Sequence, residues 1–150
     1  MKLLHLSFFF CCVISLQAQK TSVFAERTAE YERGLDLYDK GVYGAALTAF
    51  EKSSKIDAEL VEPKADLLSM KSQLMMSKSA VRIGKPDAEM VMLSFFRNNT
   101  PDALAYEAVM DLGNYYYAKK NYEEAISFYN MVDPATLSDD QKSEIKFKQG

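Results

Sequence analysis

The sequence lacks tryptophan and has little of the two residue types that most often bind metals or act as nucleophiles. Its 150 residues include two cysteines and one histidine. All three (His5, Cys11 and Cys12) lie in the apolar segment at the amino terminus. If export removes that segment, Cys or His zinc sites, His-dependent catalytic pairs and disulfides are excluded from the rest of the chain. We therefore expect a non-enzymatic protein with no catalytic residue, no metal and no cofactor.

A concentration of positive charge is also missing. The chain has 18 Lys and Arg against 21 Asp and Glu, and the basic residues form no stripe. Nucleic-acid-binding surfaces need such a stripe because phosphate contacts dominate their affinity, so nucleic acid is not an expected partner. The adjacent acids Glu123-Glu124 and Asp139-Asp140 fall at helix starts or in a loop, where they favour the helix dipole. We do not interpret them as acid–base pairs.

Residues 1–18 have the pattern of a signal peptide. Lys2 is positive, residues 3–16 are the apolar run LLHLSFFFCCVISL, and polar residues follow. Such a run suits a signal peptide and is short for a membrane span. We predict cleavage after Ala18, export to the periplasm or envelope and no transmembrane span thereafter. An uncleaved anchor is the alternative. A lipid-modified cysteine is disfavoured because the cysteines follow bulky Phe residues.

Two stretches of the remaining chain follow one plan. Residues 34–55 read GLDLYDKGVYGAALTAFEKSSK and residues 113–132 read GNYYYAKKNYEEAISFYNMV. Small and aromatic residues matched at this spacing indicate an internal repeat of helical hairpins, which must stack to bury their apolar sides. The alternative is two unrelated amphipathic hairpins. The matched pairs are Gly34 with Gly113, Tyr38 with Tyr117, Tyr43 with Tyr122, Ala46 with Ala125 and Phe50 with Tyr129.

The pattern predicts an all-α chain with a helical repeat domain over residues 19–150. We expect about three hairpins and the first helix of another. The expected helices are 24–40, 43–56, 63–84, 86–99, 101 to 118 or 119, 122–133 and a last one that follows a capping box at Ser138 and Gln141.

Several details of these helices are also predicted. Thr100 is the expected N-cap of the fifth helix, with a proline at its first position. The inward residues are expected to be Ala46, Leu47, Phe50 and Ser54 in the second helix, and Met90, Leu93 and Phe96 in the fourth. Phe147 and Gly150 fall where Met110 and Gly113 fall one unit earlier. We therefore expect the leading part of a longer protein, whose unpaired last helix could self-associate.

This pattern resembles the tetratricopeptide repeat (TPR), a helix–turn–helix unit of about 34 residues. Arg33 and Leu37 depart from it, since the family usually has an apolar and an aromatic residue there. Its closing proline is absent from the first unit and arrives early, as Pro134, in the later one. The run from Pro86 onward is similar to exported bacterial envelope TPR proteins, above all large ones of the Bacteroidetes. The resemblance implies a solenoid of stacked antiparallel hairpins.

In TPR proteins the first helix of each hairpin lines a groove that takes peptides. Asn114 stands where chaperone-binding repeats hold a peptide carboxylate, but the Lys and Arg that complete such a clamp are missing. The groove therefore favours apolar segments. The alternative role for these side chains is packing against adjacent hairpins. Carried onto this sequence, the resemblance implies six peptide-binding positions: Tyr31, Leu35, Tyr38, Met110, Asn114 and Tyr117.

The expected function is a non-catalytic protein–protein interaction scaffold of the bacterial cell envelope, with protein or peptide partners. One alternative is the superhelical arm of an exported peptidoglycan lytic transglycosylase. Another is a glycan-binding outer-membrane lipoprotein, which the absence of tryptophan and of a good lipid-attachment sequence disfavours.

Overall fold

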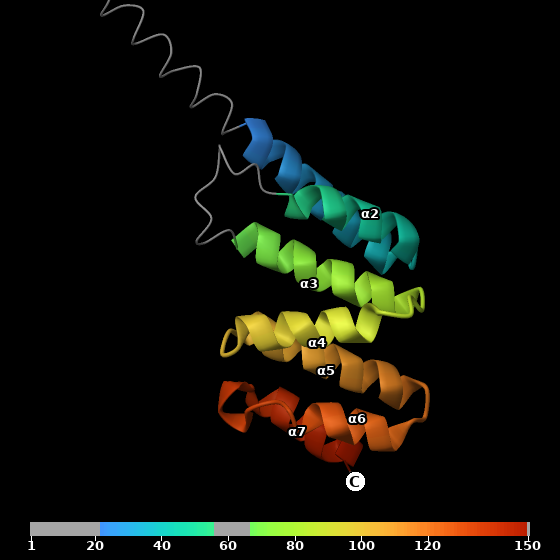
Figure 1. Cartoon of the computed structure of the whole chain (residues 1–150). Coiled ribbons are helices and arrows are strands. Elements are labelled where there is room, and N and C mark those ends of the chain that lie inside the picture. The colour runs from blue at the N-terminus through green and yellow to red at the C-terminus, as the bar shows by residue number, and fades with distance from the viewer. Residues whose placement is uncertain (1–21, 56–66, 150) are drawn as a thin grey trace, which may run out of the picture. The chain divides into compact units, whose positions relative to one another are not determined.

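The computed structural model describes residues 22–55 and 67–149. All regular structure in these ranges is helical, with no strand (Figure 1), which confirms the expected all-α class. The predicted signal peptide, the expected helix start at Pro63 and the expected role of Gly150 lie outside the described residues. The helices are 22–39, α2 (Tyr43–Ser54), α3 (Leu67–Arg82), α4 (Ala88–Asn99), α5 (Ala103–Ala118), α6 (Tyr122–Tyr129), a 3-10 turn η1 (Pro134–Thr136) and α7 (Asp139–Gln149).

The chain divides into two compact units within α3, after Gln73. In the first unit, the helix at 22–39 and α2 form an antiparallel hairpin. Phe50 of α2 is completely buried. Three contacts run along the hairpin from its open end to its turn: Arg27 Nε donates to Ser53 O at 2.8 Å, the Tyr31 and Phe50 ring centroids are 5.7 Å apart, and those of Tyr38 and Tyr43 are 5.0 Å apart.

In the second unit, α5 and α6 form a hairpin that repeats the aromatic contact beside the turn. The Tyr117 and Tyr122 rings meet edge to face at 5.3 Å, as Tyr38 and Tyr43 do in the first unit. Both turns contain a residue in the left-handed conformation, Gly41 at φ 75° and Lys120 at φ 62°. The two stretches matched in the sequence therefore form hairpins of one design.

The core of the second unit is shared among successive helices. α4 contacts α5, α5 contacts α6 and α6 contacts α7, and Figure 1 shows these four labelled helices following one another in chain order. The main apolar cluster draws on α3, α4, α5 and α6, so no single hairpin of this unit buries its apolar side alone. The largest buried members of this cluster are Leu74, Val81, Met92, Phe95, Leu112 and Phe128.

The prediction for the inward face of α4 holds for Leu93 and Phe96, which are partly buried and pack against the apolar clusters, but it is wrong for Met90. Met90 is 69% exposed, whereas Ala88, Met92 and Phe95 are buried. The segment MVMLSFF is apolar nearly all round, so its periodicity does not select one face. In α2 the prediction holds for Ala46, Leu47 and Phe50, but Ser53 is buried in place of Ser54.

The predicted start of α5 is also wrong. Thr100 closes α4, since its backbone N–H and its hydroxyl both donate to Phe96 O, at 3.0 and 2.7 Å. The N-cap of α5 is Asp102, whose carboxylate accepts from Leu104 N at 2.8 Å. An Asp is at least as good a cap as Thr, and the Thr100 hydroxyl is already engaged by the preceding helix.

The connection between α6 and α7 is partly as predicted. α6 ends at Tyr129 rather than near Asp133. The Asp133 carboxylate instead accepts from Ala135 N at 2.8 Å and starts η1. The predicted capping box is confirmed. Gln141 Oε1 accepts from Ser138 N at 2.9 Å, and Ser138 Oγ accepts from Gln141 N at 3.3 Å.

Candidate functional site

The six predicted groove residues are all half-buried. In the first unit Tyr31, Leu35 and Tyr38 are spaced so that they lie on one face of the helix at 22–39. Tyr31 packs on Phe50 and Tyr38 packs on Tyr43. Both tyrosines therefore help to hold the hairpin as well as lining its surface.

In the second unit, the equivalent face is in contact with α7. Asn114 Oδ1 accepts two hydrogen bonds of 2.7 Å, one from the Tyr129 hydroxyl and one from Lys148 Nζ. Lys148 also pairs with Glu144, and its Nζ lies 5.5 Å from the centroid of the Tyr117 ring. A cation at this distance from an aromatic face is attracted by it, so α7 supplies a polar partner to the middle of this face.

An apolar contact accompanies this polar one. Ile145 of α7 is buried with Ala125 and Tyr129 of α6, and Met110 and Tyr117 pack against the same cluster. The structure thus brings Met110, Asn114 and Tyr117 together, and all three contribute to the packing of α7. Sequence reasoning missed Lys148 and Ile145, because the residues between α6 and α7 have no regular pattern that fixes where α7 lies.

The Tyr129 hydroxyl is held in its protonated form. Burial, followed by the negative charge of Glu144, raises the pKa of Tyr129 to about 12. A phenol with this pKa remains a hydrogen-bond donor at neutral pH. The hydroxyl can therefore donate to Asn114 at physiological pH.

Two ion pairs join α3 to α5 in the second unit. Lys78 Nζ lies 2.5 Å from Glu107 Oε1, and Arg82 lies 3.2 Å from Asp111 Oδ1. The two cations are one turn apart on α3, and the two acids are one turn apart on α5. This pairing was not predicted from the sequence, although the equal four-residue spacing of the two cations and of the two acids is a signal that could have indicated it. The second oxygen, Asp111 Oδ2, is buried and has no hydrogen-bond partner among the described residues.

A small polar depression of about 280 Å³ lies beside the turn between α3 and α4. Within it, the Tyr116 hydroxyl donates to Glu89, and Lys119 Nζ lies 4.3 Å from the centroid of the Tyr115 ring. The hydrogen bond to Glu89, followed by burial, raises the pKa of Tyr116 to about 12.

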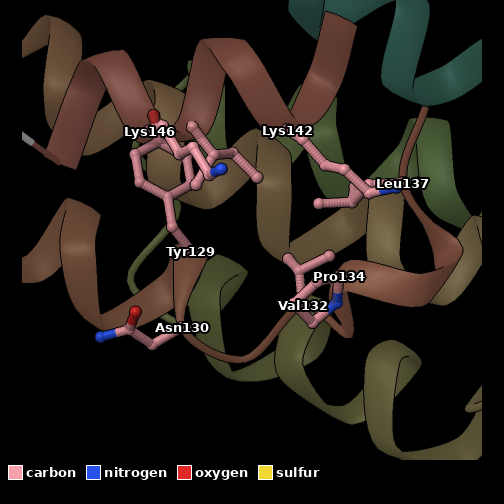
Figure 2. Close-up of a pocket in the computed structure, with 8 residues that line it drawn as sticks. Tyr129, Asn130, Val132, Pro134, Leu137, Lys142 and Lys146 are labelled. Atoms are coloured by element: carbon pink, nitrogen blue, oxygen red, sulfur yellow. The ribbon is translucent and has the colours of Figure 1, made fainter. Parts of the chain in front are cut away.

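A second pocket of about 260 Å³ lies between α6, η1 and α7 (Figure 2). Figure 2 shows Tyr129 and Lys146 at one end of the pocket and Leu137 and Lys142 at the other, with Val132 and Pro134 along its lower side. Its remaining lining residues are Asn130 and Ile145.

The described residues contain no group of three or more His, Cys, Asp or Glu side chains that could hold a metal ion. Within the same ranges, no helix is both long enough and apolar enough to cross a membrane. Comparison with known proteins gives no relative: no family model matches the chain, and neither the curated proteins nor the solved structures contain a significant match.

Proposed function

We propose that this chain is a non-catalytic interaction scaffold, built as a TPR-like solenoid, that binds protein segments. The observation that carries the proposal is the repetition of one hairpin design. Gly34 lies against Phe50 as Gly113 lies against Tyr129, and the tyrosine pairs beside the turns are equivalent. A hairpin reused along a chain serves to extend a surface, and such surfaces bind extended partners.

The proposed binding surface is the face of the first helix in each hairpin. In the helix at 22–39 it comprises Tyr31, Leu35 and Tyr38, and in α5 it comprises the parts of Met110, Asn114 and Tyr117 that remain exposed beside α7. These residues present aromatic rings, aliphatic groups and one amide. Such a surface favours a partner segment with apolar anchors rather than a highly charged one.

We also propose that the protein works in the bacterial cell envelope after export. The support is the pattern of residues 1–18 together with the resemblance of the repeat to exported TPR proteins. In this setting the partners are envelope or periplasmic proteins, and no catalytic group or cofactor is required.

The experiment compares two identical substitutions in the first unit. Leu35→Glu places a charge in the middle of the proposed face, whereas Leu67→Glu places one on an already exposed leucine of α3. Leu35 is preferred over the tyrosines because their rings pack within the hairpin. Partners captured from envelope extracts are then quantified for both variants and the unsubstituted protein.

We expect Leu35→Glu to reduce capture of the specific partners by about tenfold, which corresponds to about 1.4 kcal/mol, and Leu67→Glu to retain them. Circular dichroism establishes that both variants are folded. If a folded Leu35→Glu protein retains every partner, the face is not the binding surface. Equal losses from both variants would also contradict the proposal.

A further inference from the structure

The pocket between α6, η1 and α7 has an apolar interior and a positively charged rim. Val132, Ile145 and Tyr129 are buried residues that reach its wall, and Leu137 and Pro134 add further apolar surface. The cations are Lys142 and Lys146, one turn apart on α7 and hence on the same face of that helix. No acidic side chain is among the lining residues.

The charge on this rim is poorly compensated. Lys146 forms no ion pair with any residue in the described ranges. Lys142 has one partner, Asp139, at 3.6 Å, whose side chain is fully exposed to solvent. Exposed pairs of this kind contribute little. Both ammonium groups are therefore available to a negatively charged ligand, and their aliphatic stems extend the apolar wall.

The size of the pocket selects the kind of ligand. Its volume of about 260 Å³ lies just under the range of about 300–1,000 Å³ that is typical of small-molecule sites. A single apolar side chain fits such a space better than a complete drug-sized ligand. Apolar anchors seated in small pockets, surrounded by charged or polar groups, are the usual energetic centres of protein interfaces.

We propose that this pocket binds one apolar side chain of a protein segment whose neighbouring residues are acidic. The anchor would lie against Val132, Leu137 and Ile145, and the flanking carboxylates would pair with Lys142 and Lys146. The lining residues of this pocket are not those of the first-helix face, so the two proposals are tested with different substitutions.

The test uses a labelled heptapeptide with a central Leu flanked on each side by three Glu residues. Two matched probes replace the central Leu with Gly or the six Glu with Lys. Fluorescence anisotropy gives the affinities at low and high salt, and methyl NMR spectra report on Leu137 and Ile145. We expect the first probe to bind with a dissociation constant on the order of 1 mM or tighter, to shift these methyl signals and to weaken with salt.

Variants of the protein test whether the charges of Lys142 and Lys146, rather than a change in the fold, account for binding. Lys142→Gln/Lys146→Gln should weaken binding by about tenfold. The control Lys55→Gln/Lys71→Gln removes the same charge from exposed sites and should change binding by less than about twofold. Glutamine suits a helix, and thermal melting checks that α7 persists.

Four results would each overturn the proposal. They are absence of binding at about 5 mM probe, equal affinity for the Leu and Gly probes, equal affinity for the Glu and Lys probes, and unchanged affinity in a folded Lys142→Gln/Lys146→Gln protein.

Discussion

The ring of Phe50 fills the space that a side chain on Gly34 would need. A Cβ built on Gly34 would lie 2.7 Å from Phe50 Cδ1, and one built on Gly113 would lie 2.6 Å from Tyr129 Cδ1. Both distances are far below van der Waals contact. The glycine and the aromatic residue of each hairpin therefore form one packing unit, and this unit explains why their spacing repeats in the sequence.

Gly34→Ala should destabilise the first unit. The methyl group would overlap a buried ring, and overpacking of this kind costs about 1–3 kcal/mol, whereas the better helix propensity of alanine returns only about 0.5–1 kcal/mol. Urea denaturation followed by circular dichroism gives the free energy of unfolding. We expect a net loss, and a similar one for Gly113→Ala.

The control is Gly44→Ala, in α2, where a Cβ would have no atom within 4 Å. This substitution should be neutral or stabilise the protein by up to about 1 kcal/mol. If the Gly34→Ala protein were as stable as the Gly44→Ala protein, the Phe50 ring could not lie as close to Gly34 as these distances indicate.

Features set by local spacing could be predicted from the sequence. The hairpin register from Gly34 to Phe50 and the capping box at Ser138 depend on residues close together in the chain, so their chemistry is visible in it. The inward face of α4 could be predicted only in part, because apolar residues occur nearly all round that helix and its periodicity does not exclude Met90. The meeting of Lys148 with Asn114 depends on the path of the connection before α7, which no periodicity specifies.

Buried serines also limit what a hydrophobic pattern can predict, as the choice of Ser54 instead of Ser53 shows. Ser72 and Ser79 of α3 are buried although their type is usually exposed. Their hydroxyls donate to Leu68 O and Met75 O within the same helix, both at 2.7 Å, and the Ser53 and Ser72 hydroxyls are 2.9 Å apart. Since these bonds satisfy the polar groups, small serines can occupy a helix contact, which a hydrophobic pattern does not reveal.

Lys120→Gly should stabilise the second unit. Lys120 has φ 62° at the position equivalent to Gly41, and a left-handed conformation costs a residue with a Cβ about 1–2 kcal/mol. Glycine removes that cost, although it also raises the conformational entropy of the unfolded chain. We therefore expect the free energy of unfolding to rise by about 0.5–1 kcal/mol. The midpoint of thermal unfolding should rise by a few degrees.

The matched comparison is Gly41→Ala, which introduces a Cβ at φ 75°. It should lower the free energy of unfolding by about 1 kcal/mol. The same sign of change in both variants would contradict the equivalence of the two turns.

Arg82→Met should destabilise the second unit more than Lys78→Met. The Asp111 side chain is only 15% exposed, so losing Arg82 leaves a mostly buried carboxylate without its cation, whereas Glu107 is 50% exposed and can be hydrated. We expect losses of about 2–3 kcal/mol for Arg82→Met and under about 1 kcal/mol for Lys78→Met. Chemical denaturation provides both values.

A double variant isolates the cause. Arg82→Met/Asp111→Asn removes the buried negative charge of Asp111 together with its partner Arg82. The double variant should therefore be at least about 1 kcal/mol more stable than Arg82→Met. A double variant no more stable than the single one would show that the loss came from packing rather than from the unpaired carboxylate.

Glu89→Gln should lower the pKa of Tyr116. The hydrogen bond to Glu89 is the largest cause of the raised value, and the charge of Glu89 adds to it. The ordinary value of tyrosine is 10.0 and the value in the fold is about 12. Absorbance near 295 nm follows the ionisation, and the difference from Tyr116→Phe assigns it. Glu124→Gln, which removes a more weakly acting charge, should lower this pKa less.

The same shift predicts how stability depends on pH. Because the folded protein holds the Tyr116 proton more tightly than the unfolded chain, this contribution is complete below about pH 10 and is lost between about pH 10 and 12. Stability should therefore fall across that interval, and it should fall less steeply in Glu89→Gln and in Tyr116→Phe. Thermal unfolding at intervals from pH 9 to 12 gives the slopes. Equal slopes in all three proteins would mean that the Tyr116–Glu89 hydrogen bond does not hold the proton.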